Sequence, residues 1–108
     1  MEELLPVACS LTGPELAARR AGVLADIRRS HQEVRWLPDG VALRFTLGPG
    51  RLATLGTLID LERQCCAFLR FRLMVEPEEG VVWLELTGPP GTRDFLAEEV
   101  VGKTPRST

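Results

Sequence analysis

Two neighbouring cysteines, Cys65 and Cys66, are the residues whose type and spacing most directly suggest chemistry. Adjacent α-carbons lie about 3.8 Å apart, whereas disulfides prefer about 4.4–6.8 Å, so a disulfide between these two would strain the backbone. On a helix, adjacent side chains diverge by about 100°, and only a loosened helix end lets both sulfurs meet one ion. Thiolates suit soft ions such as Cu(I) and, by extension, Hg(II) and As(III). The pair therefore indicates capture of a soft metal or metalloid ion, with Cys9 as the only candidate third ligand.

Two other roles for the cysteines stay open. One is a thiol enzyme, either a redox protein that cycles Cys9 against one of the pair or a lyase or transferase with a cysteine nucleophile. The sequence offers no clear base, and the end of a helix disfavours a thiolate, so we assign no catalytic residue. The other role is a structural or interaction module in which the cysteines pack as small hydrophobes.

Charged residues near the pair also need an interpretation. Glu62 lies one turn before Cys66 on an otherwise apolar helix face. This position predicts that Glu62 has a charged partner, such as an arginine from a strand. The alternative is that Glu62 supports the ligands of a bound ion. The first helix carries two arginine pairs, Arg19 with Arg20 and Arg28 with Arg29. We expect both pairs to be solvated, and a clamp for an anionic partner is the alternative.

Missing motifs exclude several classes of function. The chain has no Tyr, a single His, no glycine-rich phosphate loop, no H-E-x-x-H and no G-x-S-x-G. Nucleotide, zinc-hydrolase and serine-esterase chemistry are therefore excluded, and the soft ion is the only cofactor or ligand that we expect. The turn Gly48-Pro49-Gly50 is interpreted as a connector before a helix, and His31 as the residue that caps the end of the first helix.

Composition sets the class of protein. The chain has 108 residues, of which 44% are hydrophobic and 26% are charged, with a formal net charge of −2. These values predict one globular domain over residues 1–108, with an N-terminal segment at 1–11 and a frayed tail at 102–108. They argue against nucleic acid as a partner, and no apolar run approaches the length of a membrane span. An odd number of cysteines and no secretory signal predict a soluble, cytoplasmic protein with reduced thiols.

Hydrophobic periodicity predicts five structural units. Apolar residues at helical spacing indicate a helix over 15–32, a second from Leu52 to Phe68 or Leu69, and a short third helix over 92–101. Alternating apolar residues indicate one β-hairpin over 34–47 and another over 71–86.

The order hairpin, Gly-Pro breaker, helix occurs twice, over 34–68 and 71–101, which indicates an internal ββα duplication. We predict an α+β fold of order α-ββ-α-ββ-α, with a four-stranded antiparallel sheet and helices packed on one face. Two hairpins in separate sheets are the alternative. The oligomeric state is open, and a homodimer is one option.

The double-cysteine run also carries a resemblance to a family. The segments concerned are Leu61-Glu-Arg-Gln-Cys-Cys-Ala-Phe-Leu-Arg-Phe71, Ala8-Cys-Ser-Leu-Thr12 and Val82-Trp-Leu-Glu-Leu-Thr-Gly88. They resemble small bacterial proteins with a Glu-Arg-x-Cys-Cys-Pro-Phe signature, often associated with mercury or other heavy-metal resistance genes. The resemblance implies a thiol-based heavy-metal role for Cys9, Cys65 and Cys66. It departs at Ala67, where the family usually has proline, so the helix is expected to run further.

Overall fold

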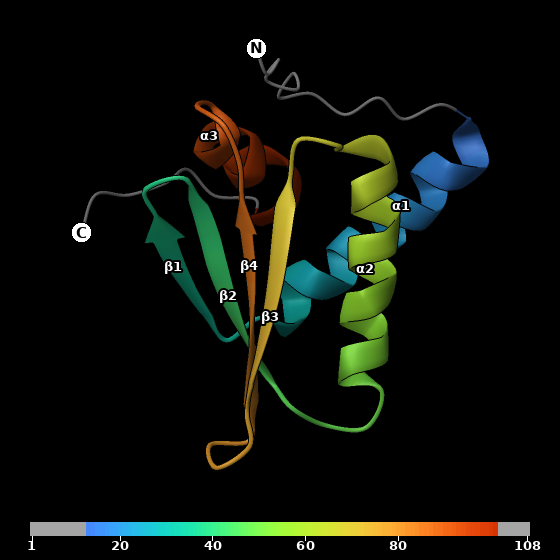
Figure 1. Cartoon of the computed structure of the whole chain (residues 1–108). Helices are drawn as coiled ribbons and strands as arrows, with labels where there is room; N and C mark the ends of the chain where they lie inside the picture. The colour runs from blue at the N-terminus through green and yellow to red at the C-terminus, as the bar shows by residue number, and fades with distance from the viewer. Residues whose placement is uncertain (1–12, 102–108) are drawn as a thin grey trace.

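The computed structural model describes residues 13–101 apart from the side chains of Leu16 and Cys65. The elements follow the predicted order, and Figure 1 shows their arrangement. They are α1 Pro14–Ser30, β1 Glu33–Leu37, β2 Gly40–Thr46, α2 Arg51–Cys65, β3 Arg70–Glu76, β4 Val81–Thr87, α3 Thr92–Leu96 and the π-helix η1 Ala97–Val101.

All four strands form one antiparallel sheet in the order β1-β2-β4-β3. The two hairpins meet through β2 and β4, where Val41 lies opposite Leu86 and Leu43 opposite Leu84. The prediction of a four-stranded antiparallel sheet is confirmed, and the alternative of two separate sheets is wrong. Strands β1 and β3 are the two edges of the sheet.

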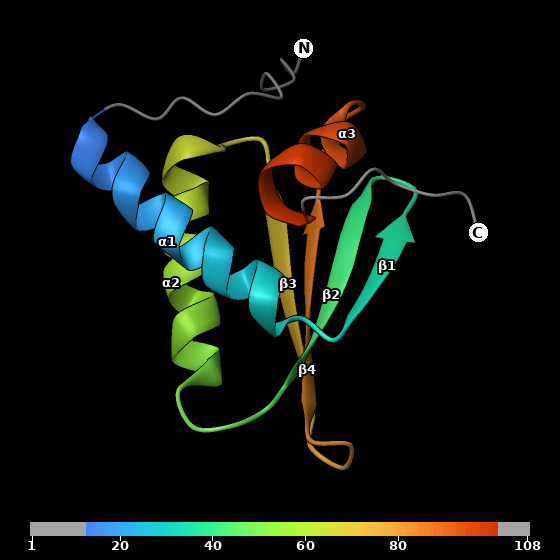
Figure 2. The same cartoon turned by 180° about the vertical axis from the view of Figure 1, so that it is seen from behind.

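The helices lie on one face of this sheet, as Figures 1 and 2 show from opposite sides. Alternation in β2 and β4 points apolar side chains toward the helices, and those of Leu43, Phe45 and Leu84 are completely buried there. Helix residues such as Ile27 and Leu58 complete the same core. The hydrophobic effect of this shared core holds the helical layer on the sheet.

The opposite face of the sheet carries none of the described helices (Figures 1 and 2). There the Arg35 guanidinium carbon lies 4.6 Å from the centroid of the Trp83 ring, and Arg72 is 3.6 Å from a Glu85 carboxylate oxygen. Such contacts suit a solvated sheet face.

The two ββα halves share one backbone feature and differ in another. Helices α2 and α3 both begin directly after a left-handed glycine, Gly50 with φ 79° and Gly91 with φ 98°. The hairpin turns differ, because Gly80 is left-handed with φ 66° whereas Gly40 is the first residue of β2. The last helix covers the predicted range, but it changes from α-helix to π-helix at Ala97.

Helix α1 ends close to its predicted end. Its C-cap is His31, whose backbone N–H and ring Nδ1 both lie 3.1 Å from the carbonyl oxygen of Ile27. The predicted capping role of His31 is therefore confirmed.

An exposed glycine in the middle of α2 offers a first test of the fold. A Cβ atom added at Gly56 would meet no atom within 4 Å. Glycine is a poor helix former, so Gly56→Ala should raise the free energy of unfolding by about 0.5–1 kcal/mol in urea denaturation. A Cβ atom at Gly50 would also meet no atom within 4 Å, but Gly50 has a left-handed backbone conformation. Gly50→Ala should therefore lower the free energy of unfolding. A destabilised Gly56→Ala protein would contradict the helical assignment of this segment.

Candidate functional site

Helix α2 ends at the cysteine pair. Cys65 is the last helical residue, and Cys66 leaves the helix with φ −123° and ψ 69°. The Cys66 backbone N–H still donates to the Glu62 carbonyl at 2.6 Å, while its own carbonyl accepts from the backbone N–H of Leu69 at 3.1 Å. The predicted helix end near Phe68 or Leu69 is therefore wrong, because this turn must redirect the chain into β3. The two cysteines consequently differ in backbone conformation, and the helical divergence of about 100° no longer relates them.

The Cys66 side chain lies in the hydrophobic core and has no exposed surface. The guanidinium of Arg20 approaches it, with its Nη2 atom 3.9 Å from the sulfur. At this distance a guanidinium N–H can donate to the sulfur in a weak hydrogen bond. This contact is the chemical feature that distinguishes Cys66 from a cysteine surrounded only by hydrocarbon.

The same guanidinium binds a completely buried carboxylate. Arg20 donates from Nε to Glu62 Oε1 at 2.9 Å and from Nη2 to Glu62 Oε2 at 3.3 Å. Its Nη1 atom also donates to Glu99 Oε1 of η1 at 3.1 Å. We call Arg20, Glu62, Cys66 and Glu99 the Arg20 cluster. It joins α1, α2 and η1, and one guanidinium faces two carboxylates, so that the buried Glu62 has a cationic partner.

The sequence prediction for Glu62 is confirmed in part. Glu62 has an arginine partner, but the arginine comes from α1 and not from a strand. The expectation that Arg20 is solvated is wrong, because only 11% of its side chain is exposed. A signal for this was present, since Arg20 precedes the buried Leu24 and Ile27 by four and seven residues and therefore lies on the same helix face.

Arg28 has a second structural role. It donates from Nε to the Val100 carbonyl at 3.2 Å, and from Nη2 to the carbonyls of Glu98 and Glu99 at 3.2 and 3.0 Å. These carbonyls belong to η1, whose end would otherwise leave acceptors unsatisfied. Arg20 and Arg28 thus attach η1 to α1, while Arg19 and Arg29 are exposed as expected.

Only one of the three predicted sulfur ligands has a described side chain. Cys9 lies outside the described residues, as does the side chain of Cys65, so the predicted three-sulfur site remains a prediction. Among the side chains that are described, no group of three or more His, Cys, Asp or Glu is arranged to hold a metal ion. The described start of α1 lies at the same end of the helical layer as the cysteine end of α2 (Figures 1 and 2).

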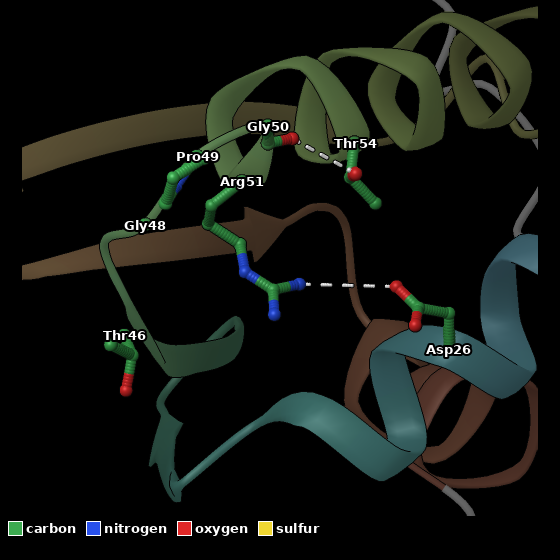
Figure 3. A pocket seen from close by; sticks show the side chains of 7 residues that line it. All are labelled: Asp26, Thr46, Gly48, Pro49, Gly50, Arg51 and Thr54. Atoms are coloured by element: carbon green, nitrogen blue, oxygen red, sulfur yellow. Dashed lines mark hydrogen bonds and ion pairs between the residues drawn. The ribbon is translucent and has the colours of Figure 1, made fainter.

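A pocket of about 320 Å³ lies at the opposite end of α2, away from the cysteines. Figure 3 shows Arg51 reaching across this pocket toward Asp26, with 3.9 Å between Nη1 and Oδ2. Thr54 donates its hydroxyl to the carbonyl of Gly50 at 3.0 Å. Since Asp26 offsets the charge of Arg51, the pocket offers no uncompensated cation to an anion. The interpretation of Gly48-Pro49-Gly50 as a connector is in keeping with this arrangement.

No family model, curated protein or solved structure matches this chain. None of the helices within residues 13–101 is long and apolar enough to cross a membrane. Among the described residues, the Arg20 cluster and the end of α2 at the cysteine pair are the features with potential chemistry.

Proposed function

We propose that this protein captures a soft metal or metalloid ion, Hg(II), As(III) or Cu(I), through Cys65 and Cys66, with Cys9 as the third ligand. The observation that carries the proposal is the end of α2 between the two cysteines, with the Arg20 guanidinium 3.9 Å from the Cys66 sulfur. The helix end relaxes the geometry that would hold adjacent thiols apart. A guanidinium N–H of Arg20 is directed toward the Cys66 sulfur, and the thiolate is the form of cysteine that binds such ions. Thiolate ligands also require a reducing compartment, for which we propose the cytoplasm.

Binding of the ion is an exchange of protons for metal. Each coordinating thiol releases its proton to water as its sulfur binds the ion. Glu62 and Glu99 hold the Arg20 guanidinium in place and balance its charge before the ion arrives. Because Cys66 has no exposed surface, capture requires local opening at the end of α2, so association and release should both be slow.

A titration of the reduced protein with each ion tests this proposal. Free thiols are counted by maleimide labelling after each addition, continued long enough for the buried Cys66 to react in the ion-free protein. We expect one equivalent of a bound ion per chain to protect all three cysteines, because three sulfurs complete a low-coordinate site. Unchanged labelling of the cysteines at every ratio of ion to protein would refute metal capture.

Single Cys→Ser variants identify the ligands. Changes beside metal ligands typically cost about 10–100-fold in affinity, so loss of a sulfur ligand should cost at least that much. We expect Cys9→Ser, Cys65→Ser and Cys66→Ser each to have this effect. Ser10→Ala, next to Cys9, is the matched control and should leave the affinity unchanged.

Complete burial of Cys66 supports a second candidate, a module whose cysteines only pack. This candidate predicts that a Cys9, Cys65, Cys66 triple Ser variant behaves like the wild type in metal-challenged cells, whereas metal capture predicts increased sensitivity of those cells.

The contact between Arg20 and Cys66 also fits a thiol enzyme. Such an enzyme would require a cysteine that is alkylated at a pH well below the ordinary thiol pKa of about 8.5.

A further inference from the structure

Strand β3 is an edge of the sheet with an unusual surface. It pairs with β4 on one side, and no other described strand pairs with its outer side. Four large hydrophobic residues of the described chain are exposed, and three of them are consecutive in β3: Leu73 at 41%, Met74 at 38% and Val75 at 42%. A long apolar edge with open backbone hydrogen-bonding groups is a template for a further strand.

We propose that β3 pairs antiparallel with β3 of a second copy of this chain, about a two-fold axis at Leu73. The strand is complementary to itself in this register. Arg70 at its start lies opposite Glu76 at the end of the second copy's strand, and the reverse pair repeats the contact. Between them, Phe71 lies opposite Val75 of the second copy, and the two Leu73 residues face each other. Opposite charges and apolar pairs across strands stabilise a sheet.

This register is favoured over its neighbours. An axis at Leu73 pairs all seven residues of β3 with the second strand. An axis at Arg72 would place two arginines directly opposite each other, which is destabilising. An axis at Met74 would bring Pro77 opposite Phe71, and proline has no backbone N–H to donate.

The proposed pairing also preserves the layers of the fold. Directly opposite residues in an antiparallel pair point to the same face of a sheet. Leu73 and Val75 lie opposite Leu84 and Val82 of β4, so they are on the face that carries the helices. An axis at Leu73 therefore joins the two four-stranded sheets into one sheet with both helical layers on the same face.

The other edge of the sheet does not share these features. Strand β1 has five residues and carries an ion pair between Arg35 and Glu33 at 3.1 Å. Its apolar residues, Val34, Trp36 and Leu37, are half-buried, so it offers a second strand no run of exposed apolar side chains. Only β3 combines three consecutive exposed apolar residues with opposite charges at its two ends.

Sedimentation of the reduced, full-length protein over a range of concentrations tests the dimer. We expect the mass of two chains, and we expect Leu73→Lys to raise the dimer dissociation constant by about tenfold or more, because two lysines would meet at the axis. Leu37→Lys, in the other edge strand, is the matched control and should remain dimeric. Circular dichroism establishes that both variants fold. A monomeric wild type, or a Leu73→Lys protein as dimeric as the control, would overturn the proposal.

Charge reversal tests the register. Arg70→Glu and Glu76→Arg each place like charges opposite each other and should weaken the dimer, whereas the double variant Arg70→Glu/Glu76→Arg should restore it. Restoration in the double variant would support the axis at Leu73, and equal weakening without restoration would overturn it. The assay does not involve the cysteines, so its outcome is independent of metal capture.

Discussion

Replacing Arg20 by methionine should lower the free energy of unfolding by about 3–5 kcal/mol, measured by urea denaturation at neutral pH. Glu62 is completely buried and receives two hydrogen bonds from this guanidinium. Methionine keeps most of the side-chain length and leaves the carboxylate charged without its cation. A buried charge that loses its partner is among the most destabilising changes known in proteins.

Two variants separate this effect from a general loss of packing. Arg19 is the neighbouring exposed arginine, so Arg19→Met should change stability by less than about 0.5 kcal/mol. The double variant Arg20→Met/Glu62→Leu removes both charges and should recover much of the lost stability, because a buried ion pair is often replaceable by apolar residues. If Arg20→Met costs no more than Arg19→Met, the Arg20 cluster does not stabilise the fold.

Gly40→Ala should be the second most damaging change, with a loss of about 3 kcal/mol in the free energy of unfolding. A Cβ atom at this position would lie 1.9 Å from the carbonyl oxygen of Leu86 and 2.8 Å from the Thr87 α-carbon. Both are backbone atoms of β4, which pairs with β2 at the centre of the sheet. Since backbone atoms of a central strand cannot turn aside as a side chain does, the two strands must separate locally.

Gly48→Ala is the matched control, because a Cβ atom there would meet nothing within 4 Å. It should change stability by less than about 0.5 kcal/mol. Thermal unfolding followed by circular dichroism compares the two variants. A Gly40→Ala protein that is as stable as Gly48→Ala would show that β2 and β4 do not approach each other as closely as the structure has them.

The Arg20 cluster connects stability with the proposed chemistry. One guanidinium contacts a carboxylate of α2, a carboxylate of η1 and the Cys66 sulfur. Any opening that brings an ion to Cys66 must therefore disturb contacts that hold three elements together. We expect capture of a soft ion to be coupled to the local stability of the contacts between α1, α2 and η1, since the Arg20 cluster takes part in both.

Local patterns in the sequence were enough for much of the fold. The alternation of Val41, Leu43 and Phe45 predicts a strand because side chains on a strand alternate between faces within a few residues. Helical spacing predicts α1 and α2 for the corresponding reason. The two ββα units, the antiparallel sheet and the helices on one face followed from these short-range rules and from short connections.

The candidate site was predictable only in outline. A carboxylate at Glu62 on an apolar face predicts a cationic partner, and the structure has one. The pattern did not indicate which arginine it would be, because Arg20 is 42 residues away in the chain. The end of α2 at Cys65 was also not predictable, since the residues that follow it have no glycine or proline to stop a helix.

The amino-acid sequence by itself determined the order and type of the elements and the two adjacent cysteines, because both depend on neighbouring residues. Only the tertiary structure decided that Arg20 meets Glu62 and Cys66, and that the strand order leaves β3 at an edge. The physical reason is that contacts between distant segments depend on how whole faces pack together, which no short stretch of chain specifies.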